Sequence, residues 1–323
     1  MTYNALTTSV AAVLLLLMSE LYCGAGDAVF SSDGERVYLL SDIDSKPAVE
    51  EIDLDKKTTR KIPLTQLERS DSLRGITCTA KNRFFCTTAE AVWTIEPQSG
   101  RLTKIPDAPT GVGFWGIAYD PKMQRIFVTT DDREQPVFTF KDPEEWTPVR
   151  MRRHPYPSSL VFAANGELFF AAYGDLWCGE IQTEKVDEKD YFSIAAYRCA
   201  PLATLETQNT TPAEIGVADI GVARDTVYLQ LSRMGGSGDG WFARLPTPSI
   251  KRDTEGEMEM FYQPKERLPI YLKALQSLEI LGEDSRAGSI CVSLDGTRVH
   301  YVLHDKHWLV VNGKTEELHL RER

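Results

Sequence analysis

The sequence lacks the short motifs that mark common enzyme chemistries, and it lacks an excess of positive charge. It contains no Gly-x-Ser-x-Gly nucleophile elbow, no His-Glu-x-x-His helix and no Cys-x-x-Cys pair. Its 36 Lys and Arg residues face 47 Asp and Glu residues, which gives a formal net charge of -11. Because phosphate binding requires clustered Lys and Arg, this balance excludes nucleic acid as the expected main partner.

Long hydrophobic runs are scarce, and the one that stands out lies near the N-terminus. Val10–Met18 is unbroken apolar sequence, which has the length of a signal h-region and is too short to span a bilayer. The small residues of Cys23–Gly26 follow it. We therefore predict a signal peptide at 1–25, a domain at 26–323, and a secreted or periplasmic location without a membrane span. A retained apolar segment packed on the domain is the alternative.

Cysteine is also sparse, and its spacing suggests disulfides. Removal of the signal segment leaves Cys78, Cys86, Cys178, Cys199 and Cys291. Cys78 and Cys86 lie on the two arms of one hairpin, and Cys178 and Cys199 lie on consecutive expected strands, so each pair is predicted to form a cross-strand bridge. Cys291 is then left as a buried thiol. A chain with all five thiols reduced remains the alternative, since sequence alone does not define connectivity.

The sequence does contain a strand–turn–strand pattern that recurs six times. The copies are AVFSSDGERVYLLS, GITCTAKNRFFCTT, GIAYDPKMQRIFVTT, SLVFAANGELFFAAY, DIGVARDTVYLQLS and SICVSLDGTRVHYVLH. Two further β-prone runs follow most hairpins, and the first spacings match the roughly 40 to 50 residues of a propeller blade. We predict an all-β, six-bladed β-propeller of four-stranded antiparallel blades, with a helix at Ile270–Leu281. A seventh blade within 250–285 stays open.

Propeller topology predicts where ligand-binding residues gather. Loops that enter first strands share one face, at the mouth of the central channel, with loops that join second to third strands. The hairpin turns at Gly34, Gly166 and Gly296 then lie on the opposite face as structural elements. Carboxylates and guanidinium groups at the mouth suit a polar or charged ligand. The ligand-binding candidates are Arg74, Trp115, Ser158, Asp219, Arg286, Asp132 and Arg233, with Trp115 as aromatic anchor. Ordinary solvated loop ends are the alternative.

Three other constellations carry weaker signals. Asp131–Glu134 holds three carboxylates that suit Ca²⁺, but no loop has EF-hand spacing. His304–His307 holds two imidazoles without a third ligand at a recognisable spacing, which favours a simple turn. Arg233–Gly240 is rich in glycine but lacks the Gly-Lys-Ser/Thr ending of a phosphate loop, so we interpret it as a loop of the binding face.

The hairpins VFSSDGERVYLL and CVSLDGTRVHYV resemble the strand–turn–strand units of β-propellers of the YVTN, NHL, TolB and SMP-30/gluconolactonase kind. This WD40-like superfamily resemblance covers residues 27–320, although the Gly-His and Trp-Asp signatures of WD40 repeats do not recur. The resemblance implies architecture rather than function, because such propellers include both enzymes and binding proteins.

Gluconolactonase-like propellers hold a divalent metal with a Glu, an Asn and an Asp, and their Asn stands in a Pro-Asn-Gly run. The corresponding run here is Pro157-Ser158-Ser159, so the Asn is missing, while Asp219 matches the Asp and no Glu matches. We therefore expect an exported, non-catalytic propeller without a cofactor that binds a protein, a peptide or a small polar ligand. The alternative is a metal-dependent lactonase or hydrolase that uses Ca²⁺ or another divalent metal.

Overall fold

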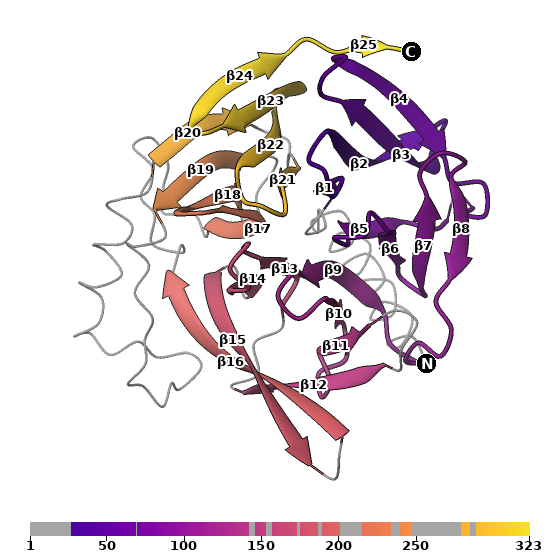
Figure 1. The fold of residues 1–323 in the computed structure, drawn as a ribbon, viewed down its shortest axis with the longest axis vertical. Coiled ribbons are helices and arrows are strands. Elements are labelled where there is room, and N and C mark those ends of the chain that lie inside the picture. The colour runs from indigo at the N-terminus through magenta and orange to yellow at the C-terminus, as the bar shows by residue number, and fades with distance from the viewer. Residues whose placement is uncertain are drawn as a thin grey trace, which may run out of the picture.

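The structure is a computed structural model with an all-β, propeller-like arrangement of strands around a common centre (Figure 1). It describes residues 27–68, 70–141, 146–152, 157–172, 175–186, 189–200, 215–233, 240–246, 279–284 and 289–323. The predicted signal peptide lies outside these ranges. Within them no helix is long and apolar enough to cross a membrane. The all-β class predicted from the hairpins is confirmed.

Strands that follow one another in the sequence pair antiparallel in runs of four. The first run contains β1 (Ala28–Phe30), β2 (Arg36–Ile43), β3 (Lys46–Asp53) and β4 (Thr58–Pro63). The second contains β5 (Leu73–Cys78), β6 (Phe84–Thr88), β7 (Val92–Glu96) and β8 (Arg101–Lys104). The third contains β9 (Phe114–Asp120), β10 (Arg125–Thr130), β11 (Val137–Phe140) and β12 (Thr147–Arg152).

The second half of the chain repeats this arrangement. The fourth run contains β13 (Ser159–Phe162), β14 (Leu168–Ala172), β15 (Asp175–Val186) and β16 (Lys189–Ala200). The fifth contains β17 (Ile215–Ala223), β18 (Thr226–Arg233), β19 (Gly240–Pro246) and β20 (Glu279–Asp284). The sixth contains β21 (Ile290–Val292), β22 (Arg298–Leu303), β23 (Lys306–Val311) and β24 (Lys314–Leu318).

The first strand of each run lies near the centre and packs against the first strands of its two neighbours (Figure 1). The runs form five sheets, because β12 pairs in parallel with β16 and joins the third and fourth runs into one eight-stranded sheet. The short β25 (Arg321–Glu322) pairs in parallel with β4 of the first run. The last residues of the chain are therefore tied to its beginning.

Apolar side chains fill the seam between each pair of neighbouring runs. Strands β6 (FFCTT) and β14 (LFFAA) are buried at every position, since sheets cover both of their faces. Rings meet across the seams: Tyr38 and Phe84 have centroids 4.5 Å apart, and Phe242 and Tyr301 have centroids 4.1 Å apart. Burying a side chain of this size stabilises a fold by about 1.5–3 kcal/mol. Among the described strands only β12–β16 and β25–β4 pair between runs, so the other strands of neighbouring runs meet through side-chain packing in the seams.

The predicted hairpin turns are confirmed at three positions that need a left-handed backbone. Gly34, Gly166 and Gly296 have φ angles of 72°, 83° and 68°, a region that glycine adopts without steric cost. Each amide donates to the carbonyl three residues earlier. In the first and last hairpins an Asp carboxylate, Asp33 or Asp295, accepts from the backbone two residues later and so stabilises the turn.

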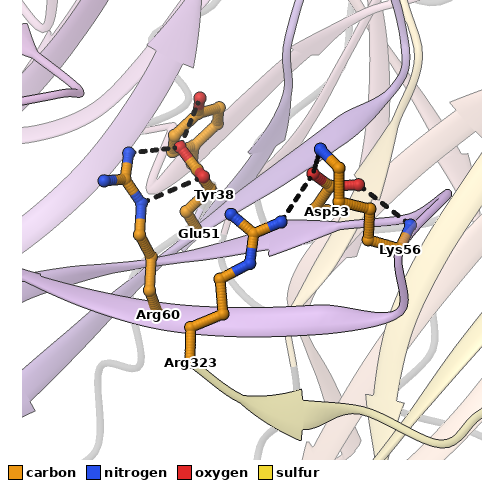
Figure 2. Close-up of polar contacts among 6 residues, drawn as sticks. All are labelled: Tyr38, Glu51, Asp53, Lys56, Arg60 and Arg323. Atoms are coloured by element: carbon orange, nitrogen blue, oxygen red, sulfur yellow. Dashed lines mark hydrogen bonds and ion pairs between the residues drawn. The ribbon is translucent and has the colours of Figure 1, made fainter.

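Two groups of polar contacts lie in the first run, and one of them also binds the end of the chain (Figure 2). Glu51 accepts hydrogen bonds from the Tyr38 hydroxyl and from Nε and Nη2 of Arg60, all at 3.0 Å. Asp53 accepts from Lys56 Nζ at 2.7 Å and from Nη2 of Arg323, near the chain end, at 3.2 Å. The hydrogen bond from Lys56 is the main reason that the pKa of Asp53 is lowered.

The predicted disulfides are wrong. Cys78, Cys86 and Cys178 are buried free thiols, and burial raises the pKa of Cys78 to about 12. The strand register gives the reason: Cys78 stands opposite Phe84, and Cys178 stands opposite Tyr197. Cys86, the intended partner of Cys78, is therefore diagonal to it, roughly 7–8 Å away, which is too far for a disulfide. The description of Cys199 is limited to its backbone. Cys291 is a buried free thiol, as predicted.

The fourth run is extended, and the fifth differs from the sequence-based expectation. In the fourth run β15 and β16 form a long ribbon, in which they pair as far as Val186 and Lys189. The strand that pairs with β19 is β20, whose first three residues fall in the predicted helix. Residues 270–278 of that helix lie outside the described residues.

Candidate functional site

The loops that precede first strands lie beside the loops that follow second strands, as the sequence predicted. Asp131, which follows β10, donates its amide to the carbonyl of Gly113, which precedes β9, at 2.9 Å. The Phe114 amide donates to Ala89, which follows β6, at 3.0 Å. We call this side of the ring the entry face. It is defined by Arg74, Trp115, Asp131 and Ser158.

Arg74 and Trp115, which the sequence singled out separately, lie in contact on the entry face. They stand on adjacent first strands, β5 and β9, and the Arg74 Cζ atom lies 4.3 Å from the centroid of the Trp115 ring. Arg74 Nη1 donates to the Phe114 carbonyl at 3.0 Å. Both residues are partly exposed. Burial lowers the pKa of Arg74, while the Asp131 carboxylate opposes this effect.

Two carboxylates of the acidic loop after β10 accept hydrogen bonds from backbone amides. Asp131 Oδ1 accepts from the Gly113 amide at 2.6 Å, and Asp132 Oδ1 accepts from the Glu134 amide at 2.8 Å. Ser158, before β13, donates its hydroxyl to the Ala171 carbonyl at 3.4 Å, and its own carbonyl lies against Gly116, next to Trp115. These contacts hold the rim of the entry face beside Trp115.

Asp219 is buried and ties two neighbouring runs together. It is 4% exposed, and a bulge in β17 turns its side chain toward β21. Its Oδ1 accepts from the Ile220 amide at 2.8 Å, and its Oδ2 accepts from the Ile290 amide at 3.0 Å. Asp27, just before β1, has its pKa raised well above the ordinary value by burial and by the charge of Asp219. Two carboxyl groups thus converge near the centre of the ring.

Sequence reasoning missed Gln230, which stands on β18 directly opposite Asp219. Gln230 is 1% exposed, and neither its Nε2 nor its Oε1 atom has a hydrogen-bond partner. Unpaired buried polar groups cost about 1–3 kcal/mol. We expect Gln230→Leu to raise the free energy of unfolding by about that amount, measured by urea titration.

The matched control for this prediction is Gln135→Leu. The Gln135 amide donates to the Val137 carbonyl at 2.8 Å and to the Val149 carbonyl at 2.9 Å, so its removal should lower stability. Destabilisation by Gln230→Leu would contradict the prediction. Destabilisation that occurs only with added Ca²⁺ would instead show that the amide carbonyl binds a cation.

The other predicted site residues belong to the fifth and sixth runs and the segments beside them. Arg286 and most of the glycine-rich Arg233–Gly240 segment lie outside the described residues, and Arg233 itself is described as the last residue of β18 by its backbone alone. His304 and Asp305 form the turn between β22 and β23 with positive φ angles, as the turn interpretation of His304–His307 predicts. His307, the last residue of that segment, contacts His300: the Nε2 atom of His300 lies 3.1 Å from the Nδ1 atom of His307.

The described residues do not match the metal-ligand set of gluconolactonase-like propellers. Ser158 stands where that resemblance requires Asn, and its hydroxyl is turned toward the Ala171 carbonyl. Both oxygens of Asp219 already accept from backbone amides. Within the described ranges no group of three or more His, Cys, Asp or Glu residues is arranged to hold a metal ion.

Comparison of the whole fold with solved structures confirms a β-propeller, as the resemblance of the hairpins predicted. A gluconolactonase from Xanthomonas campestris matches with a TM-score of 0.53 and 12% identity, over 90% of this chain and 88% of that chain. A streptogramin B lyase matches with a TM-score of 0.48 and 10% identity, over 92% and 93%. A chain of a nidogen/laminin complex matches with 0.48 and 12%, over 84% and 90%. Protein-family models and curated proteins give no match.

Proposed function

We propose that the chain is an exported, non-catalytic, six-bladed β-propeller that binds a protein, a peptide or a small polar ligand at its entry face. Each run of four strands is one blade, and the closed circle of contacts among first strands supports this count. The observation that carries the binding function is the Arg74–Trp115 pair. It brings a guanidinium and an aromatic ring from two blades together at a partly exposed position.

Two features favour binding over catalysis. The two carboxyl groups near the centre have structural roles. Asp219 accepts hydrogen bonds from two backbone amides, and burial favours the protonated form of Asp27. The Arg–Trp pair, by contrast, is positioned at the rim, where aromatic and Arg residues commonly anchor partners. Export is supported by the apolar Val10–Met18 run alone.

The test is a thermal-shift screen of peptides and small polar compounds against the purified protein. We expect some compounds to stabilise the wild type and to lose their effect in the Arg74→Ala/Trp115→Ala double variant. The matched control is Arg83→Ala, since Arg83 also lies over an aromatic ring, Phe85, at 5.5 Å, but at a hairpin turn on the opposite face. Its ligand response should stay unchanged.

Two outcomes would overturn the proposal. The first is a set of compounds whose stabilising effect survives in the double variant, because the entry face would then not be the binding surface. The second is a stoichiometric Ca²⁺ or Zn²⁺ ion in the purified protein, found by mass spectrometry together with lactone hydrolysis that stops on chelation. That result would favour the metal-dependent alternative.

A further inference from the structure

The Arg74 guanidinium is held in one orientation but uses little of its hydrogen-bonding capacity. It lies over Trp115, with 4.3 Å between Cζ and the ring centroid, and Nη1 donates to the Phe114 carbonyl at 3.0 Å. Among the described residues this is the one hydrogen bond that the side chain makes. A guanidinium carries five N–H donors in one plane. Most of these donors therefore remain for another molecule.

The charge of Arg74 also has no ion-pair partner among the described residues. Asp131 acts on the pKa of Arg74 through its charge, but its Oδ1 accepts from the Gly113 amide at 2.6 Å rather than from the guanidinium. Burial meanwhile lowers the pKa of Arg74, which means that the cation has lost part of its hydration. A partly desolvated cation without a paired anion favours binding of one.

The surroundings favour an anion of single charge. A guanidinium fits a carboxylate or a phosphate with two parallel hydrogen bonds. Asp131 and Asp132 lie on the same rim, and the chain carries a net charge of -11, so a doubly charged phosphate would be repelled more strongly than a carboxylate. One guanidinium can neutralise one carboxylate.

We propose that Arg74, whose guanidinium lies over the Trp115 ring, receives the carboxylate group of the ligand. This inference rests on the proposed function, because it names the chemical class that the entry face binds. A peptide C-terminus and a small organic acid both present this group. Trp115 acts as a positioning residue, since its ring packs against the guanidinium that Phe114 also holds.

The experiment compares acids with their neutral counterparts by isothermal titration calorimetry. The probes are N-acetyl-trialanine with a free C-terminus, the same peptide as its C-terminal amide, propionate and propionamide. We expect one or both acids to bind the wild type more tightly than the matching amide. A preference for the peptide acid identifies a C-terminus, and a preference for propionate identifies a small organic acid.

Variants of Arg74 test the charge and the planar donors of the contact separately. Arg74→Gln should weaken acid binding by roughly 10- to 100-fold, the range for a hydrogen bond to a charged group, and leave amide binding unchanged. Arg74→Lys keeps the charge but loses the planar arrangement of donors. Its affinity for the acid should therefore lie between that of the wild type and that of Arg74→Gln. Arg83→Gln is the matched control and should bind as the wild type does. Circular dichroism and thermal melting check that each variant is folded.

The outcomes distinguish this inference from the proposed function. Acid and amide binding of equal strength, lost together in the Arg74→Ala/Trp115→Ala variant, would contradict a carboxylate ligand and leave the proposed function standing. Binding that is unaffected by the double variant would overturn both. An absence of acid binding at millimolar concentration would also overturn the carboxylate assignment, whatever the wider compound screen shows.

Discussion

Replacing Asp219 by alanine is expected to lower the free energy of unfolding by roughly 2–4 kcal/mol. The carboxylate is 4% exposed and accepts from the amides of Ile220 and Ile290. Each buried amide left without an acceptor costs about 1–3 kcal/mol. Relief of the repulsion from Asp27 offsets part of that loss. Urea titration followed by tryptophan fluorescence measures the change.

The matched control for Asp219→Ala is Asp132→Ala. Asp132 accepts from one amide, that of Glu134, in an exposed turn, so its loss should cost less than about 1 kcal/mol. Equal effects of the two substitutions would show that the Asp219 contacts with β17 and β21 do not hold the fifth and sixth runs together. A larger effect of Asp219→Ala places this carboxylate in the framework rather than in the binding surface.

Acidification is expected to destabilise the protein through His300, and His300→Phe should remove much of that effect. His300 is 0% exposed, and burial, followed by the charge of His307, lowers its pKa to about 3. An unfolded histidine has a pKa near 6.5. Between these values the unfolded state binds the proton more readily, so stability is lost as pH falls from about 6.5 toward 3, by about 1.4 kcal/mol per pH unit.

The neighbours of His300 reinforce this direction. His307 contacts it from β23, and its own pKa is lowered by burial despite the nearby charge of Glu50 on β3. Cys291 stands opposite His300 on β21 as a neutral thiol, because burial raises its pKa well above the ordinary value.

The measurement is urea unfolding of wild type and His300→Phe at several pH values. His319→Gln is the control, since that side chain is 84% exposed. Parallel pH profiles for wild type and His300→Phe would contradict the prediction.

The architecture could be predicted because the local sequence of each hairpin is enough to indicate two strands and a turn. Tight turns with Asp33-Gly34 or Asp295-Gly296 between alternating apolar residues require a left-handed backbone and two paired strands, whatever surrounds them. The fourth strand of the fifth run could not be predicted in this way. β20 pairs with β19 across a long intervening segment, and local pattern carries no information on such a distant partner.

The entry face was predicted in part. Topology alone placed Arg74 and Trp115 on neighbouring first strands, and the structure brings them to 4.3 Å. The burial of Asp219 could not be predicted. The sequence marks Asp219 as a polar residue at a loop end, whereas the bulge in β17 buries it beneath β21. The contact of His300 with His307 depends on strand register, and the two positions share a sheet face across the turn at His304.

The join between β25 and β4 has a consequence for the folding pathway. Arg323 and Asp53 are 270 residues apart in sequence, so the contact forms only after a very large loop has closed. Closure entropy grows slowly with loop length, but it must be met before such a distant contact contributes any stability. An open solenoid can fold repeat by repeat from either end. In this chain the first and last runs contact each other, so we expect the ring to unfold as one cooperative unit and the contact between its first and last runs to form late in folding.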